Sequence, residues 1–401
     1  MKPIDTMNIA EWHGLFEHRT AFLAEHTRNP SFAKEALASI NQIKPALSPA
    51  SNGLFELSAH LYVLALLLNR APNQTSQPGS FIGFHTHAAI SDVEKAIERI
   101  FENKPDIADE PRYWQRITEI LAYLRKLMLT EAGSKLYFYE PYISLWRCWI
   151  SPYDSSLFAD ELQLLQQAPD ELGSSHSRYP WLLAKSWICL YLRRDEEALA
   201  HLKEMSGSIA VRPEDLFPML TVLQEAEEWQ RLREWLVAAV PFMESQRLNS
   251  LTSFYRYWDS VIAHIPGAEQ QMWAPLIQML PYTKAIYEEK LLLYAKWQQW
   301  IDYQLSTSSE PLDYRVSVLA PIEKHAPELL LPFFHQAAER YVLLKNRDGY
   351  KAAVKLLKRL AKLYKKMKDE ERWESYITAF ASRNSRLRAL QEELRRGNLI
   401  P

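Results

Sequence analysis

Glycine is scarce in this sequence. It supplies 10 of 401 residues, against about 28 expected from an ordinary frequency near 7%. Sandwiches and barrels of β-strands need many glycine-bearing tight turns, so the shortage favours helices. Strand-like alternation of apolar and polar residues is also missing, whereas apolar residues recur at helical spacing, as at Trp181, Ala184 and Ile188. The sequence therefore predicts an all-α protein.

Cysteine and the common catalytic motifs are nearly absent as well. Cys148 and Cys189 lie 41 positions apart among bulky apolar residues, where a thiol is inert. This spacing fits neither a disulfide framework nor a zinc site, and it indicates a reduced compartment. The sequence has no G-x-G-x-x-G, no phosphate-binding loop, no H-E-x-x-H and no G-x-S-x-G. No catalytic residue and no cofactor is therefore predicted.

A long apolar run is lacking too. The longest, LFELSAHLYVLALLL at 54–68, contains Glu56 and His60 and is shorter than the roughly 20 residues that span a bilayer. The opening MKPIDTMNIAEWHGLF has no charged-then-apolar export signal. We expect a buried helix at 54–68, no membrane association and a cytoplasmic protein.

Two histidines form the one candidate metal site. His85 and His87 are spaced H-x-H, which lets both rings reach one ion when they lie on an extended segment. No second His or Cys pair follows at ligand spacing, and Thr86 or Ser91 is expected to cap the next helix. A structural role is preferred, and a metal-dependent enzyme that uses His85 and His87 is the last of the alternatives.

Five stretches share one local pattern, in which an apolar helix is followed by a short charged turn and a second helix. They are YLRRDEEALAHL, LQEAEEWQRLREWL, LLLYAKWQQWIDYQL, LLKNRDGYKAAVKLL and KKMKDEERWESYITAF. Asp195 and Trp229 are 34 residues apart, and Trp229 and Trp297 are 68 apart, as in tetratricopeptide repeats, but the later steps of 53 and 23 do not fit. We expect an irregular array of helical hairpins, a tetratricopeptide-like α-solenoid or right-handed superhelix. A non-repetitive α bundle is the alternative.

Breaks are predicted where Pro, Ser, Asn and Asp collect, at 70–80, 103–111, 168–180 and 306–311. They indicate three regions. These are an N-terminal helical region at 1–110, helical-hairpin repeats at 111–310, and a C-terminal helical region with a basic amphipathic helix at 311–401.

Aromatic residues are abundant, with 13 Trp and 20 Tyr, often at helix ends as in FYRYWDS at 254–260 and KWQQWIDY at 296–303. Most are expected to wedge helices together, because they bury a large area. A minority is expected to line a concave surface of the array, where peptides or protein segments bind.

Cations gather in one segment although the net charge of the chain is −2. Residues 345–368 hold ten Lys or Arg and one acid, Asp348, so this segment carries +9 and the rest of the chain −11. On a helix, seven cations fall within an arc of about 120° and extend over about 23 Å, opposite an apolar stripe. The seven are Lys351, Lys355, Lys358, Arg359, Lys362, Lys365 and Lys366.

This basic face has three interpretations. It is a solvated or internally paired surface, a contact for the phosphates of nucleic acid, or a contact for an acidic protein partner. Phosphate contacts would give salt-sensitive affinity without sequence readout. Membrane binding is not expected, because the apolar stripe is committed to packing.

The end of the chain resembles a known family. The run KNRDGYKAAVKLLKRLAKLYKKMKDEERWESYITAF, with SRLRALQEELRRGNLI after it, is similar to the C-terminal end of bacterial SWIM-type zinc-finger proteins of bacilli and their relatives. The resemblance covers roughly the last 60 residues and is fainter elsewhere. It rests on Tyr350, Ala353, Leu357, Tyr364, Trp373 and the RLRALQEEL block at 386–394.

Members of that family carry a C-x-C…C-x-H zinc finger, implicated in DNA or protein binding, ahead of a long helical region. The resemblance implies a Swi/Snf-type helicase as a partner. No C-x-C occurs in this sequence, so no zinc ligand is carried over. The chain is expected to correspond to the helical region alone, as a fingerless relative or as one part of a split protein.

Together these features predict a non-enzymatic helical-repeat interaction protein, a scaffold or accessory factor near nucleic acid or a DNA-handling complex. The basic face would make the contact. The alternative is a peptide- or protein-binding scaffold without nucleic-acid contact, in which aromatic residues make the contact instead.

Overall fold

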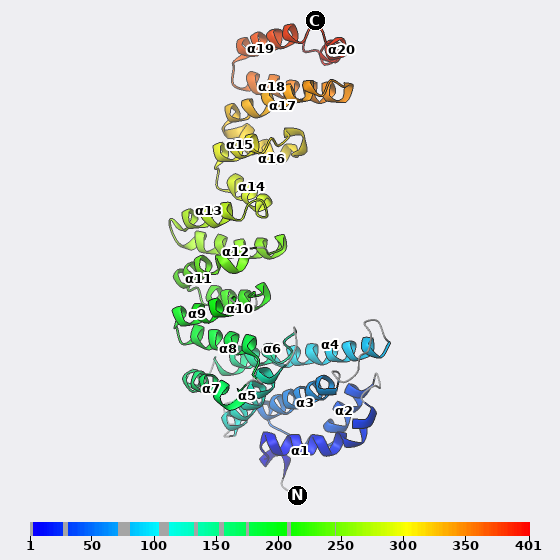
Figure 1. Ribbon diagram of the computed structural model, residues 1–401, viewed down its shortest axis with the longest axis vertical. Coiled ribbons are helices and arrows are strands. Elements are labelled where there is room, and N and C mark those ends of the chain that lie inside the picture. Colours follow the sequence, from blue (N-terminus) through cyan, green and yellow to red (C-terminus); the bar gives the residue numbers. More distant parts are fainter. Residues whose placement is uncertain are drawn as a thin grey trace. The chain divides into compact units, whose positions relative to one another are not determined.

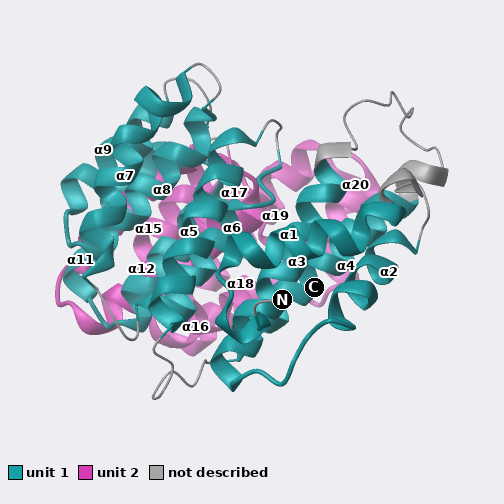
Figure 2. Cartoon of the chain, turned by 90° about the horizontal axis from the view of Figure 1, so that it is seen from below, with its two compact units in different colours: residues 1–242 teal, residues 243–401 magenta. Residues whose placement is uncertain are grey.

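The all-α prediction is confirmed. The computed structural model describes residues 3–26, 31–70, 81–103, 112–131, 135–151, 156–173, 176–206, 210–244 and 246–401. These residues form α-helices joined by turns and short 3-10 or π segments, and none of them lies in a strand. The chain divides into two compact units, 1–242 and 243–401, which are teal and magenta in Figure 2.

Unit 1 contains eleven α-helices in its described residues, coloured blue to green in Figure 1. They are α1 (Ile9–Thr20), α2 (Phe32–Asn41), α3 (Pro49–Arg70), α4 (Phe81–Glu102), α5 (Tyr113–Thr130), α6 (Tyr139–Ser144), α7 (Leu157–Leu172), α8 (Arg178–Tyr191), α9 (Asp195–Ser206), α10 (Pro213–Glu225) and α11 (Trp229–Met243), which ends at the unit boundary. The short segments are Ile4–Thr6, Ala21–His26 and the π-helical Leu145–Ile150.

The described residues of unit 2 form nine more α-helices, coloured green to red in Figure 1. They are α12 (Leu248–His264), α13 (Ala268–Gln278), α14 (Lys284–Leu293), α15 (Trp297–Ser306), α16 (Val316–His325), α17 (Leu330–Leu343), α18 (Arg347–Lys366), α19 (Glu370–Arg383) and α20 (Arg388–Arg396). Short 3-10 segments lie at Pro311–Asp313 and Pro327–Leu329.

Many helices that follow one another along the chain pack together within each unit (Figure 1). In unit 1, α8 contacts both α7 and α9, and in unit 2, α18 contacts α17, α19 and α20. Large aromatic side chains fill the space between neighbours, as the sequence predicts for most of them. The fully buried tryptophans are Trp12, Trp146, Trp149, Trp187, Trp235, Trp258 and Trp300.

The five stretches with a shared sequence pattern have the same backbone at the turn. In each, one residue with φ between 51° and 60° lies two positions before the first residue of the next helix, here α9, α11, α15, α18 or α19. After four of these turns the next N–H donates to the carbonyl five residues earlier, as Lys296 does to Leu291 at 2.8 Å. This is the Schellman helix end, which usually takes glycine at the left-handed position. In the four turns with this bond that position holds Arg193, Glu227, Ala295 or Lys368, and Lys345 is the left-handed residue of the fifth turn.

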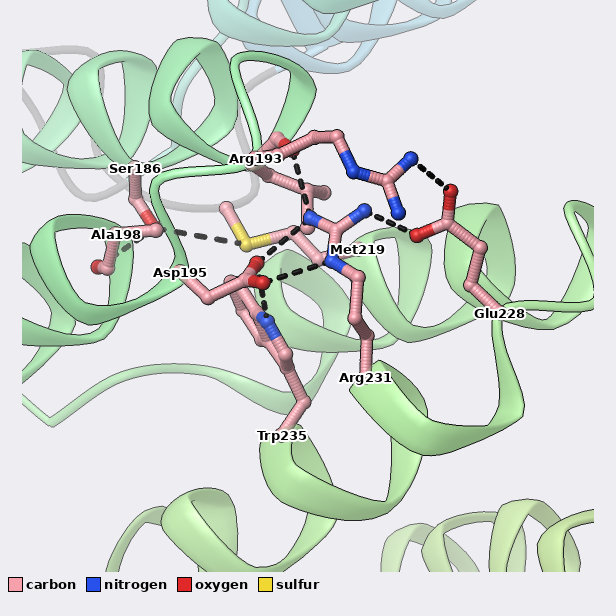
Figure 3. A network of polar contacts seen from close by, with 9 residues as sticks. Ser186, Arg193, Asp195, Ala198, Met219, Glu228, Arg231 and Trp235 are labelled. Atoms are coloured by element: carbon pink, nitrogen blue, oxygen red, sulfur yellow. Dashed lines mark hydrogen bonds and ion pairs between the residues drawn. The ribbon is translucent and has the colours of Figure 1, made fainter.

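A polar network ties one of these turns to the following helix (Figure 3). Arg231 on α11 donates to both carboxylate oxygens of Asp195 at 2.7 Å and to the Leu190 carbonyl at 2.9 Å, so it joins the start of α9 to the end of α8. Trp235 Nε1 donates to Asp195 at 2.9 Å. Burial alone would raise the pKa of Asp195, but the hydrogen bonds from Arg231 and Trp235 outweigh it and lower that pKa below its usual value.

The predicted breaks match the helix ends only in part. α15 ends at Ser306 as expected, and 71–80 and 104–111 lie outside the described residues. Within 168–180, however, α7 continues through Pro169 to Leu172. A proline leaves the carbonyl four residues earlier without its helical donor. Trp181 Nε1 donates to that carbonyl, Leu165 O, at 2.6 Å, and so replaces the missing bond.

The apolar run at 54–68 lies in α3. This is the one helix in the described part of the chain with the length and hydropathy to cross a membrane, and 61% of the stretch is buried inside the protein. Its apolar side chains pack in the core of unit 1, among them Leu54, Leu57, Leu61 and Leu64. Such burial is typical of a core helix.

The predicted helix start at Thr86 or Ser91 is wrong, and the extended segment that a shared metal would need at the two histidines is not formed. His85 and His87 both lie inside α4, and so do Thr86 and Ser91, which therefore do not cap a helix start. Residues two apart on a helix point about 200° away from each other. The apolar periodicity of the segment continues back to residue 81 and outweighs the local capping signal.

Candidate functional site

The basic helix α18 starts where sequence and packing both require it. The Asn346 side chain caps it by accepting a hydrogen bond from Gly349 N at 2.7 Å. Gly349 lies against α17, and a Cβ there would come within 2.6 Å of the Tyr341 carbonyl oxygen. Only glycine permits this close approach. The tight turn therefore fixes which face of α18 meets α17.

The apolar side of α18 is buried, as the wheel predicts. Its buried residues include Tyr350, Ala353, Val354, Leu357, Leu360 and Tyr364 from the predicted stripe, together with Leu356 and Leu363. Neighbours on this side are α17, α19 and α20. The opposite face carries the lysines and stays in water, as in other amphipathic surface helices.

Five of the seven predicted cations lie on that exposed face. Lys351 approaches Asp348 one turn earlier, with Nζ 3.8 Å from the carboxylate, and both groups are exposed. Within the described structure the other four lysines make no ion pair. They are Lys355, Lys358, Lys362 and Lys365, all exposed. Such an unpaired row of ammonium groups is available to an anionic partner.

Arg359 and Lys366 differ from these five because they lie at one edge of the arc. The Arg359 guanidinium is half-buried and stands 5.8 Å from the centre of the Phe334 ring on α17. Lys366 Nζ donates to the Glu323 carbonyl of α16. Both side chains are thus partly engaged inside unit 2, and their part in binding stays a prediction.

Two further exposed cations precede a glycine that packs on α18, and the helical wheel of α18 could not indicate this contact. The backbone of Gly397 packs so closely on α18 that a Cβ there would lie 2.8 Å from Val354 and 3.2 Å from Lys358. Arg395 and Arg396 immediately precede this glycine and are exposed. Arg395 donates to the Pro401 carbonyl at 3.1 Å, and Arg396 lies 3.4 Å from the carboxylate of Glu393. In the sequence this contact is marked only by the glycine that follows Arg395 and Arg396. The packing of Gly397 on α18 shows why a glycine lies there.

A second candidate site is a hollow of about 530 Å³ in unit 2, formed by α13, α14, α15 and the turn before α15. Its size falls in the range of ligand sites. The sequence indicated that some aromatic residues line a binding surface but not which ones. The lining residues are Trp273, Ile277, Tyr287, Lys296, Gln299, Asp302, Tyr303 and Ser306.

Three aromatic rings line the hollow, and the ring of Tyr287 stands nearly perpendicular to each of the other two. The ring of Trp273 is 6.1 Å from that of Tyr287 at 85°, and the ring of Tyr287 is 5.1 Å from that of Tyr303 at 83°. Burial raises the pKa of both tyrosines, and for Tyr303 the charge of Glu288 adds to this. Their hydroxyls therefore stay protonated over the neutral pH range.

The described residues do not form a metal centre. No group of three or more His, Cys, Asp or Glu within them is arranged to hold an ion. Cys189 is buried, which raises its pKa to about 11, and burial also raises the pKa of Cys148. Both thiols are therefore protonated at neutral pH, when a thiol is a poor nucleophile.

The structure thus defines an all-helical chain with a basic face and an aromatic hollow in unit 2. No family model and no solved structure matches the sequence. The chain is similar to the uncharacterized protein YwqB of Bacillus subtilis (strain 168), with 30% identity over 194 residues. The match covers 46% of this chain and 36% of that protein, so the matched part spans little more than a third of the relative.

Proposed function

We propose that the protein is a non-enzymatic scaffold or accessory factor, built as an irregular array of tetratricopeptide-like helical hairpins. The turns before α9, α11, α15, α18 and α19 support the array, because a left-handed residue two positions before the next helix recurs wherever the sequence pattern recurs. Arrays of this kind present extended surfaces to partners. Its place of action in this proposal is the cytoplasm.

The partner in this proposal is nucleic acid, bound through the basic face of α18. The observation that carries it is the row of four exposed lysines without ion pairs, Lys355, Lys358, Lys362 and Lys365. A surface whose lysines are paired internally would have little left to offer a phosphate. From Lys355 to Lys365 the row rises by ten residue steps, about 15 Å of helix, and DNA carries one phosphate charge per about 1.7 Å of its axis.

The test is nucleic-acid binding at two salt concentrations. With four phosphate contacts, the affinity of the wild type for duplex DNA should fall about 100-fold between 50 and 200 mM salt. The variant Lys355→Glu/Lys358→Glu/Lys362→Glu/Lys365→Glu should lose this binding for both DNA and RNA. Fluorescence anisotropy with labelled oligonucleotides measures both effects.

A matched control separates the effect of losing the basic face from the effect of lowering the net charge of the chain. The variant Lys34→Glu/Lys126→Glu/Lys203→Glu/Lys324→Glu reverses four exposed lysines that lie on α2, α5, α9 and α16, and it should keep most of the affinity. Equal losses in the two variants, or no salt-dependent binding by the wild type, would refute a nucleic-acid contact at α18.

The resemblance to the C-terminal end of SWIM-type zinc-finger proteins supports a more particular form of the proposal. In that form the protein works beside a DNA-handling enzyme, with a Swi/Snf-type helicase as its protein partner. The basic face would then hold nucleic acid while other surfaces hold the enzyme. The similarity to an uncharacterised relative adds nothing to this point.

A second candidate function is a peptide-binding scaffold without nucleic-acid contact. The observation that favours it is the aromatic hollow between α13 and α15. Concave sites lined by aromatic rings with a few polar groups are typical of ligand recognition.

A further inference from the structure

The hollow presents two helix faces to one space. Gln299, Asp302, Tyr303 and Ser306 follow one another on α15 at steps of three, one and three, which place them on a single face. Trp273 and Ile277 are four apart on α13 and line the other side. Ile277 is 49% exposed, so part of its apolar surface is open to a ligand in the hollow.

Among the described charged residues around the hollow, one carboxylate, that of Asp302, has no cationic partner. Lys296 lies 3.2 Å from Glu269, and Lys284 lies 3.7 Å from Glu288, so each nearby cation has an acid of its own. Glu269 also accepts a hydrogen bond from Trp273 Nε1 at 2.9 Å, which holds the indole in place. Among the residues that the structure describes, the carboxylate of Asp302 accepts a hydrogen bond from the neutral amide of Gln298 alone, at 2.8 Å, and it remains exposed.

We propose that this hollow binds a cationic side chain of a peptide segment, and specifically an arginine. Aromatic rings attract cations to their faces, and a planar guanidinium both stacks on such rings and donates two parallel hydrogen bonds to a carboxylate. Trp273, Tyr287 and Tyr303 supply the rings, and Asp302 supplies the carboxylate. The inference rests on the second candidate function and names its ligand.

The probe is Nα-acetylarginine amide, with the neutral Nα-acetylcitrulline amide as its near-isosteric partner. Saturation-transfer difference NMR with titration should give a dissociation constant on the order of 1 mM for the arginine compound, since small ligands of this size gain roughly 0.3 kcal/mol per heavy atom. The citrulline compound should bind at least tenfold more weakly.

Two variants assign the binding to the hollow. Asp302→Asn and Tyr303→Ala should each weaken arginine binding by about 5- to 30-fold. Asp302 is exposed, so its replacement by asparagine leaves the fold intact, which circular dichroism checks. Glu289→Gln is the matched control, because it removes an exposed carboxylate of α14 outside the hollow and should leave binding unchanged.

Equal binding of the arginine and citrulline compounds, or wild-type affinity in Asp302→Asn, would overturn the inference. Selection from a random peptide library separates this failure from that of the scaffold. Peptides that bind the wild type but not Tyr303→Ala, without enrichment of arginine, would leave the scaffold standing and remove the arginine. A library that yields no peptide dependent on Tyr303 would remove both. The charge-reversed α18 variant should retain arginine binding, since its lysines lie outside the hollow.

Discussion

At the scale of single residues, burial sets the charge of His13 in unit 1. Its Nε2 lies 2.9 Å from Ser58 Oγ, and its ring lies 4.4 Å from that of Tyr123. Burial lowers the pKa of His13 to about 4, because the charged imidazolium would lose its water. The unfolded chain has a histidine pKa near 6.5, so between these values the unfolded state binds a proton that the folded state does not.

We therefore expect acid to destabilise unit 1 through His13. The free energy of unfolding should fall as pH drops from about 6.5 towards 4, by up to about 2 kcal/mol at pH 5. His13→Gln should remove this part of the pH dependence. Urea unfolding of both proteins at pH 7.5 and pH 5 measures it as a difference of differences.

The comparison with the variant is needed because another residue of unit 1 acts in the opposite sense. Burial raises the pKa of Glu131 to about 7, which outweighs the hydrogen bonds from Tyr137 N and Phe138 N. Its contribution to stability is lost as pH rises from about 4.5 through 7. An identical pH dependence in wild type and His13→Gln would show that His13 contributes nothing.

At the scale of elements, the turns explain how a helical chain manages with ten glycines. The left-handed position of each Schellman turn carries a side chain, and this conformation costs a residue with a Cβ about 1 kcal/mol. Hydrogen bonds made by residues at the start of the next helix offset part of this free-energy cost. Asp195, at the start of α9, is one of them, because it binds Arg231 and Trp235.

Ala295→Gly should therefore stabilise unit 2 by about 1 kcal/mol, because the exposed Ala295 has φ of 53° and makes no interaction that glycine would lose. Ala379→Gly is the matched control. Ala379 is an exposed interior residue of α19, where the same change should cost about 1 kcal/mol. Thermal unfolding measures the change in stability of both variants. A loss of stability in Ala295→Gly would contradict the prediction that the backbone at Ala295 is strained.

The sequence predicted these elements unevenly. Apolar periodicity predicted α18 and its two faces, because a 20-residue amphipathic pattern has one stable solution. It missed the continuation of α7 through Pro169, since the indole that satisfies Leu165 O comes from α8. It also placed a helix start at Thr86 or Ser91, where capping residues occur inside a longer helix.

At the scale of the whole molecule, each unit has its own core of aromatic side chains. Trp300 in unit 2 is fully buried, with its ring 5.2 Å from that of Tyr314 and 5.9 Å from that of Phe333. Trp187 is likewise fully buried in unit 1, where its ring stacks on that of Tyr191 with the ring centres 5.8 Å apart. Units with separate cores can open separately.

Trp300→Ala should cost unit 2 about 3–5 kcal/mol, because it leaves a cavity that neighbours fill only in part. Hydrogen exchange followed by mass spectrometry should then rise across 246–401 much more than across 3–242. Trp187→Ala should show the reverse. Faster exchange throughout the chain in both variants would mean that the two units unfold as one.

The sequence by itself determined the helical class, the amphipathic α18 and the row of lysines that faces away from its apolar stripe. These follow from local spacing, since residues three and four apart share one side of a helix. Tertiary structure alone decided that Arg359 and Lys366 are engaged by α17 and α16, that Gly397 packs against Val354 and Lys358, and that Asp302 lines one hollow with Trp273 and Tyr287. Each of these contacts joins segments distant along the chain, and their meeting depends on how whole helices pack.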